Sequence, residues 1–259
     1  MTTAAVGSAD HAALATTGAA AQDGATVDAR RSARAVGVFF LLATAAGVVH
    51  MALAAPVLGG DDLLADVAAG RTQLLVSVLA VLVMAVSVVG VSVAAYPVLR
   101  RRSPALALGY VASRTAEGIF FAVGAMLLIG LVTVADGATG AAGNADLDAL
   151  GEVLVGMREW GAGAVVNTAV FPVGALVLYG LLHRARLVPR WLAGWGFVGA
   201  LLYLAAGLLL ALDQIGGVST EMVLLNAPLA VNELVLAVWL IVRGFDPAAV
   251  AALPGRRAA

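Results

Sequence analysis

Long apolar stretches alternate with short polar segments along most of the chain. Six stretches are long enough to cross a bilayer as an α-helix, which takes about 20 apolar residues. The pattern therefore predicts an all-α fold, a polytopic six-helix transmembrane bundle within residues 31–245. The third stretch is longer than one crossing needs, so we expect it to tilt, kink or protrude. The six predicted spans are residues 35–57, 73–98, 104–134, 159–182, 190–212 and 222–243.

Three segments fall outside the spans. Residues 1–30 are rich in Ala, Thr, Gly and Asp without an apolar helical stripe, which predicts a disordered tail. Residues 246–259 form a second, short tail. Before the fourth span, apolar residues recur at helical spacing behind Asp146, a suitable N-cap, from Leu147 to Met157. This spacing predicts a short amphipathic helix in that loop.

Arginines gather at one end of the predicted spans, and this asymmetry indicates the orientation. The opposite loops have only Arg71 and Arg158, together with most of the acidic residues. Because positively charged loops stay in the cytoplasm, we expect both termini to be cytoplasmic, in a bacterial plasma membrane. The arginines of the predicted cytoplasmic side are Arg30, Arg31, Arg34, Arg100, Arg101, Arg102, Arg184, Arg186, Arg190, Arg243, Arg256 and Arg257.

Composition narrows the class of protein further. With 62% hydrophobic and 12% charged residues, the chain has the composition of an integral membrane protein. A net charge of -1 argues against nucleic acid as a partner, because no basic surface exists to neutralise phosphates. The chain has no cysteine, which excludes disulfides and thiolate chemistry. The lipid bilayer and a small-molecule or ion ligand are the expected partners.

A few polar residues interrupt the spans, and they are the candidates for function. An ionisable group at membrane depth is costly and is a candidate for a ligand or proton site. Arg114 and Glu117 are three residues apart on one helical face, so they can pair locally. The full set of candidates for ligand binding or proton coupling is Arg114, Glu117, Glu233, His50, Asn167 and Asn232.

The rise of about 1.5 Å per residue places these side chains at different depths. Arg114 and Glu233 both lie about 15 Å from the predicted cytoplasmic side, and Glu117 lies about 20 Å from it. His50 and Asn167 both come to about 24 Å. The count predicts two layers, with Arg114 beside Glu233 and with Glu117 near His50 and Asn167.

Two carboxylates and one arginine leave one excess negative charge in this set. A protonated glutamate, a protonated His50 or a bound cation could neutralise it, and each would link the protein to protons or cations. The alternative is structural, with a buried arginine–carboxylate pair that fixes helix register and a second glutamate that is neutral and hydrogen-bonded.

Signatures of metal, haem or enzyme chemistry are missing from the sequence. His50 with Glu117 and Glu233 could in principle hold a divalent metal, but no metal-binding motif such as H-E-x-x-H supports this. No second intramembrane histidine is present for bis-His haem. No nucleophile elbow, P-loop or dinucleotide fingerprint occurs in a suitable context. We therefore expect no metal and no cofactor, and an intramembrane enzyme is the least favoured of the functional classes.

Three segments resemble the bacterial membrane family catalogued as domain of unknown function 4386, and the resemblance runs from about Ser32 to Phe245. That family carries an Arg-x-x-Glu pattern in its third span and a late glutamate, tryptophan and basic-Gly pair in its last. These positions match Arg114, Glu117, Glu233, Trp239, Arg243 and Gly244. The segments are "RARLVPRWLAGWGFVGALLYLAAGLLL", "ASRTAEGIFF" and "NAPLAVNELVLAVWLIVRGF". The family has no established activity, so the resemblance implies the architecture and leaves the function open.

Two functional hypotheses follow from the residues. The first is a small transporter or permease-like protein in which Glu117 or Glu233 couples to protons or a small ligand and Arg114 is the counter-charge. The second is a non-catalytic scaffold or accessory subunit whose buried charges only hold the bundle together.

Overall fold

The computed structural model describes residues 4–138, 145–164, 166–216 and 219–254, with side chains described from Val27 onward except at Ala162 and Asn167. These residues form helices and short connections, and the described ranges contain no strand. The elements are α1 (Ala4–Leu58), α2 (Leu63–Ala69), α3 (Arg71–Arg102), α4 (Pro104–Ala138), α5 (Ala145–Gly156), η1 (Met157–Ala164), η2 (Val166–Val170), α6 (Phe171–Ala185), α7 (Arg190–Ala211), α8 (Thr220–Val242) and α9 (Pro247–Ala252).

Six helices of the described chain are long and apolar enough to cross a membrane, as the sequence predicted. The protein is a multi-pass membrane protein with an all-α fold. The spans lie at Val27–Leu58, Arg71–Arg102, Pro104–Ala138, Thr168–Ala185, Arg190–Ala211 and Thr220–Val242. The 35-residue helix α4 is about 50 Å long at 1.5 Å per residue, so it exceeds the hydrocarbon thickness as expected.

Two elements differ from the expected pattern. α1 begins at Ala4 and so runs through the segment for which disorder was expected. The division of the chain into two tails and a membrane domain stays a prediction. The fourth span is regular only from Phe171, because Met157–Ala164 and Val166–Val170 are π-helical. The short amphipathic helix expected before this span is confirmed as α5, Ala145–Gly156.

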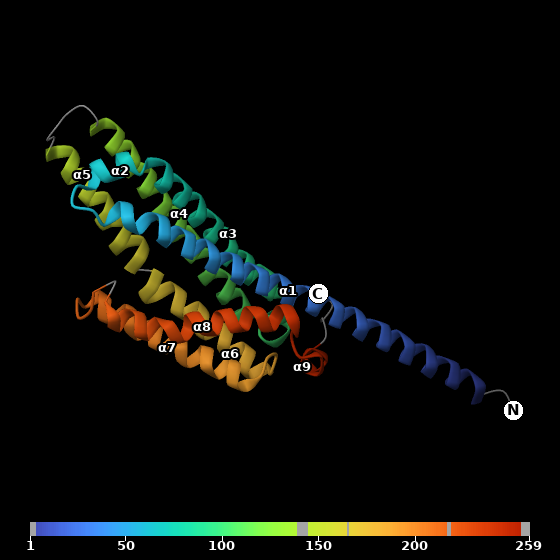
Figure 1. Ribbon diagram of the computed structural model, residues 1–259. Helices are drawn as coiled ribbons and strands as arrows, with labels where there is room; N and C mark the ends of the chain where they lie inside the picture. The colour runs from blue at the N-terminus through green and yellow to red at the C-terminus, as the bar shows by residue number, and fades with distance from the viewer. Residues whose placement is uncertain (1–3, 139–144, 165, 217–218, 255–259) are drawn as a thin grey trace.

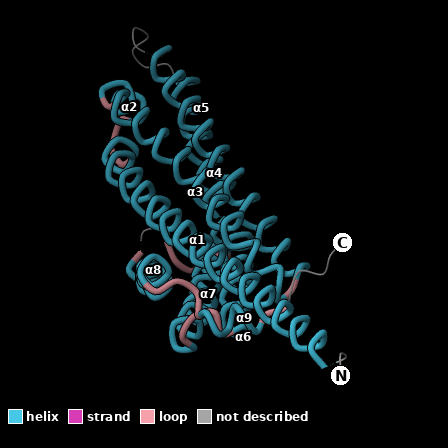
Figure 2. Tube along the Cα trace, turned by 90° about the vertical axis from the view of Figure 1, so that its right-hand side faces the viewer, coloured by secondary structure: helices cyan, strands magenta, loops and turns pink. Residues whose placement is uncertain are grey.

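The helices form two packed groups that share α1 (Figures 1 and 2). In the first group, α1 packs along α3 and α3 packs along α4. In the second group, α8 packs against both α7 and α1, and α6 packs against α7 and α4. Gly37 allows the close approach of α1 and α8, because a Cβ there would lie 2.5 Å from the Ala237 carbonyl oxygen. α4 and α8 do not pack along each other, so only long side chains can connect these two helices directly.

Tight turns end the helices on the side of the bundle where α9 lies, which we call the terminal side; the opposite side, with α2 and α5, is the far side (Figure 1). α3 ends where Ser103 becomes extended, and Pro104 starts α4 as the first helical residue. α6 ends at Arg186, whose φ of 53° reverses the chain toward α7.

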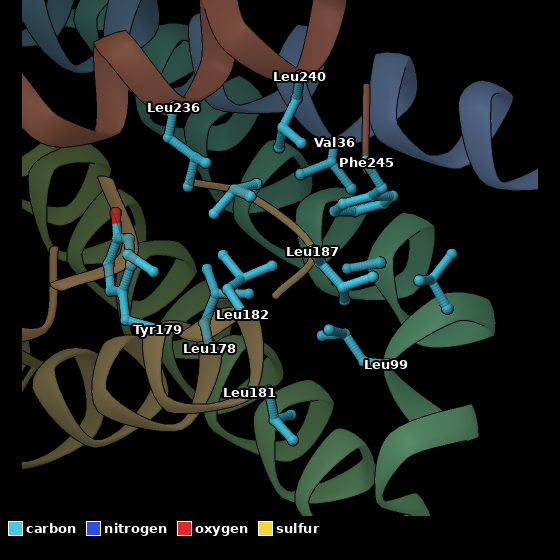
Figure 3. Packing of buried hydrophobic residues seen from close by; sticks show 14 of the residues in the cluster. Val36, Leu99, Leu178, Tyr179, Leu181, Leu182, Leu187, Leu236, Leu240 and Phe245 are labelled. Carbon is cyan, nitrogen blue, oxygen red and sulfur yellow. The ribbon is translucent and has the colours of Figure 1, made fainter. Parts of the chain in front are cut away.

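Apolar side chains form two separate core clusters, one toward each side of the membrane. The cluster toward the terminal side includes Tyr110, Tyr179, Leu187 and Phe245, and Figure 3 shows the last three of these among its leucines. The cluster toward the far side is built from α1, α2, α3 and α4 and includes Leu128. On α4, Arg114 and Glu117 lie between residues of the two clusters, whereas Glu233 of α8 lies between Leu229 and Leu236 of the first cluster. These ionisable side chains form a polar layer inside the bundle.

Candidate functional site

Arg114 on α4 is the centre of the polar layer. Its side chain is 2% exposed and faces two carboxylates and one phenol. Nη1 donates to Glu117 Oε2 at 2.7 Å, Nη2 lies 3.5 Å from Glu233 Oε1, and Nε donates to the Tyr110 hydroxyl at 3.3 Å. The local pair expected from the i,i+3 spacing is present, and so is the link to α8 expected from the depth count. One guanidinium therefore contacts a glutamate of its own helix, α4, and a glutamate of α8.

Aromatic rings surround the same guanidinium. Its central carbon lies 5.0 Å from the ring centroid of Phe171, 5.6 Å from that of Tyr110 and 5.8 Å from that of Phe40. A cation over an aromatic face is stabilised by about 0.5–2 kcal/mol, and most when it is desolvated. These rings come from α6, α4 and α1, so the charge is held by three helices as well as by its hydrogen bonds. We call Arg114, Glu117, Glu233 and these three rings the Arg114 centre.

The π-helical segment positions one of these rings. η2 gives way to α6 at Val170, which places Phe171 beside Arg114. A π-turn leaves backbone carbonyls without their usual partners, and the Ser113 hydroxyl of α4 donates to one of them, the Val170 carbonyl, at 2.7 Å. In the other direction, the Thr168 hydroxyl of η2 donates to the Gly207 carbonyl of α7 at 3.0 Å. Ser113, the residue before Arg114, thus ties α4 to the π-helical part of the fourth span.

The two glutamates of the Arg114 centre have different surroundings. The Glu117 side chain is 3% exposed, whereas that of Glu233 is 17% exposed and lies 0.8 Å further from the guanidinium by the two printed distances of 2.7 and 3.5 Å. Next to Glu233, Asn232 is fully buried and donates to the Leu192 carbonyl at 3.0 Å, which ties α8 to α7. Glu117 is the tightly held partner, and Glu233 is the looser one.

Among the described residues, three buried side-chain oxygen atoms have no hydrogen-bond partner. They are the Tyr179 hydroxyl of α6 and Oδ1 of Asn226 and Asn232 of α8. Tyr179 is fully buried and lies against α7 at Gly196, where a Cβ would come 2.1 Å from its ring. An unsatisfied buried oxygen costs about 1–3 kcal/mol unless water or a ligand fills the gap. This part of the bundle therefore offers polar capacity that the protein itself does not use.

His50 forms a second polar contact, closer to the far side. Its Nδ1 lies 2.8 Å from the Ser77 hydroxyl, and its Nε2 lies 2.8 Å from Arg158 Nη2. Because arginine can only donate, Nε2 accepts and the imidazole is neutral with its proton on Nδ1. Glu117 pairs with Arg114, whereas His50 contacts Ser77 and Arg158, and the predicted layer of Glu117, His50 and Asn167 stays a prediction. The side chain of Asn167, the third member of that layer, lies outside the described residues.

A comparison with protein families identifies the chain at the family level. The model of the family "Domain of unknown function (DUF4386)" matches residues 35–244, which is most of the chain and includes all members of the Arg114 centre. The chain belongs to this family. No curated protein and no solved structure matches it. Membership therefore agrees with the six-span architecture and assigns no activity.

A cavity of about 600 Å³ lies next to His50 in this DUF4386 chain. Arg158, Glu159 and Asp213 supply its charged groups, and its apolar wall includes Phe121 of α4. Burial lowers the pKa of Arg158, and neighbouring Glu159 partly offsets this. The described residues contain no group of three His, Cys, Asp or Glu side chains placed to hold a metal.

Some members of both polar sites could not be singled out from this DUF4386 sequence. Tyr110 is four residues before Arg114 on the same helical face, so its spacing was a usable signal. Phe40 and Phe171 look like ordinary apolar span residues, and only the packing of α1 and α6 brings them to Arg114. Arg158 was assigned to a loop, but the π-helical η1 carries it to His50.

Proposed function

We propose that this protein is a small transporter or permease-like protein whose Arg114 centre couples to protons or to a small cation. The observation that carries the proposal is one buried guanidinium facing two carboxylates, of which Glu117 is buried and Glu233 is partly buried. Charges at membrane depth are costly, so a surplus carboxylate is retained where it takes up and releases a positive charge. Glu233 is the coupling group, because it is the looser and more exposed of the two.

The surroundings limit what can neutralise the surplus charge. His50 Nε2 accepts a hydrogen bond from Arg158, so the imidazole is neutral, and its contacts are Ser77 and Arg158 rather than Glu117. Of the three ways to balance the charge, a proton on a glutamate and a bound cation remain. Both are exchangeable species, which is what coupling requires.

The far-side cavity supports a role in binding a small ligand. It reaches Phe121, which is one helical turn, or about 6 Å, along α4 from Glu117. Its lining combines aromatic and aliphatic walls with a few charged groups, as ligand sites commonly do. A ligand in this cavity would be close enough to the Arg114 centre to influence it through α4.

The test compares thermal unfolding of the detergent-solubilised protein across about pH 5–8, in sodium chloride and in choline chloride. We expect the wild-type melting temperature to change with pH or with sodium by about 3 °C or more, the size that about 1 kcal/mol gives in a chain of this length. Glu233→Gln removes the exchangeable charge and should flatten this response. Glu221→Gln, at the exposed start of the same helix, is the matched control. A Glu233→Gln protein that keeps the wild-type response contradicts the proposal.

A second candidate is a scaffold or accessory subunit in which the Arg114 centre only holds helices in register. The tight 2.7 Å pair inside an aromatic enclosure favours it. This alternative predicts wild-type and Glu233→Gln melting curves that respond alike to pH and sodium. It also predicts that Glu117→Gln costs more stability than Glu233→Gln without changing any ligand response, since Glu117 is the closer partner.

A further inference from the structure

An arginine-rich groove lies on the terminal side and shares no lining residue with the far-side cavity. It consists of two adjoining hollows of about 590 and 450 Å³ that share Arg186 and Asp246. One hollow adds Arg102 and Arg184, and the other adds Arg190 and Arg243. All five arginines are exposed. We call these six residues the arginine groove.

Backbone hydrogen bonds hold the walls of the groove in place. At the end of α6, the Arg186 amide donates to the carbonyls of His183 and Leu182, with Arg186 in the left-handed region. The Asp246 amide donates to the Leu187 carbonyl at 2.9 Å, which joins the segment after α8 to this turn. Beneath the groove, Leu187 and Phe245 are buried in the terminal-side cluster (Figure 3). The arginines therefore project from a fixed frame.

The groove carries a large uncompensated positive charge. Among the residues with described side chains, none of its five arginines forms an ion pair with a carboxylate. Its single acid is already engaged, because Asp246 Oδ1 accepts from the Ala249 amide and caps α9. Like charges held together in this way repel one another, and an anion bound among them would relieve the repulsion.

The position and chemistry of the groove indicate which anion it would take. Arginine presents planar pairs of N–H donors that match the oxygen atoms of a phosphate group. Arg243 also lies over the Trp239 ring at 5.8 Å, and Trp239 contacts Trp191 edge to face at 6.5 Å. Tryptophans of this kind mark the level of the lipid headgroups in membrane proteins. A basic hollow between helices at this level is a suitable site for an anionic headgroup.

We propose that the arginine groove binds a phosphate group, carried by an anionic phospholipid or by a soluble phosphate ester. The site is independent of the Arg114 centre and of any coupling there. Arg186 is its central donor, because it lines both hollows. Trp239 would report binding, since its ring contacts Arg243.

The test is a tryptophan-fluorescence titration of the detergent-solubilised full chain with three probes. Dihexanoyl phosphatidylglycerol represents the anionic lipid, dihexanoyl phosphatidylcholine its zwitterionic counterpart, and glycerol 3-phosphate the soluble ester. We expect saturable binding of the first or third probe that is at least about tenfold tighter than that of phosphatidylcholine. Saturation by phosphatidylglycerol alone identifies a lipid headgroup, and saturation by glycerol 3-phosphate identifies a soluble ester. Saturation by neither overturns the proposal.

Three variants separate a specific site from general attraction. Arg186→Gln should weaken binding at least about tenfold, which corresponds to the loss of one charge-assisted contact. Arg243→Lys keeps the charge and loses the planar donor pair, so an intermediate loss is expected. Arg34→Gln removes an exposed arginine of α1 that does not line either hollow and should bind like wild type. Equal weakening by Arg34→Gln and Arg186→Gln overturns the proposal, because it shows non-specific electrostatics.

Discussion

Arg114 and Arg158 both place a guanidinium against polar partners inside the helical bundle, but their surroundings differ. Arg114 projects from a regular helix, is 2% exposed and is enclosed by two carboxylates and three rings. Arg158 projects from the π-helical η1, is partly exposed, and faces a neutral imidazole beside a cavity of about 600 Å³. The first arrangement favours a fixed geometry, and the second leaves room for a ligand.

The difference shows what burial demands of a charge. A deeply buried arginine is stable only with carboxylates at short distance, since its desolvation costs several kcal/mol. A partly exposed arginine keeps part of its hydration, so a neutral acceptor such as His50 is sufficient. Replacing each arginine separately by glutamine therefore measures how much each one contributes to the free energy of unfolding.

The largest effect is expected for Arg114→Gln. This change leaves Glu117 and Glu233 without their cation, and loss of one member of a buried ion pair typically costs about 3–5 kcal/mol. We expect a strong fall in the free energy of unfolding, measured by denaturant titration in mixed micelles, or a failure to accumulate in the membrane.

A triple variant tests whether the lost stability comes from the unpaired carboxylates rather than from a general failure to fold. Arg114→Gln combined with Glu117→Gln and Glu233→Gln removes all three charges and should recover most of the lost stability. If the triple variant is no more stable than Arg114→Gln, the unpaired carboxylates are not the cause of the loss.

A smaller effect is expected for Tyr110→Phe. The ring stays in place under Arg114, and only the hydroxyl that accepts from Nε at 3.3 Å is lost. We expect a loss of about 1 kcal/mol in unfolding free energy, the usual value of such a bond. Tyr96→Phe, on a ring that packs against partly exposed Arg100, is the control and should be near neutral. Equal losses in both variants would contradict a special role for the buried phenol.

The sequence was most informative where local rules or lipid burial decide the structure. Backbone groups in lipid must be satisfied within each segment, so apolar runs such as those of α3, α4, α7 and α8 have to be helices. The Arg114–Glu117 pair follows from i,i+3 spacing within one helix, and the Arg114–Glu233 contact follows from counting the same rise along two straight helices.

The sequence was least informative where register changes. The π-turns of η1 and η2 shift the residues that follow relative to a regular helix, and no residue type in that segment announces them. The sequence pattern therefore gave no sign that Arg158 reaches His50. The same shift brings Phe171 to Arg114 and Arg158 to His50, so both contacts depend on tertiary packing rather than on local pattern.

The smallest effect is expected for Arg158→Gln, the counterpart of Arg114→Gln. Its partner is neutral and the site is partly exposed, so the loss in unfolding free energy should be about 1 kcal/mol or less. The contact needs a neutral imidazole to accept the hydrogen bond. It is therefore present at higher pH and lost once acid protonates the imidazole. The stability difference between wild type and Arg158→Gln should shrink as the pH is lowered. Arg71→Gln, which removes an exposed pair with Asp136 and involves no imidazole, should show no such trend. A difference that stays constant with pH would mean that Arg158 stabilises the fold without His50, and the contrast between the two arginines would then lie in burial alone.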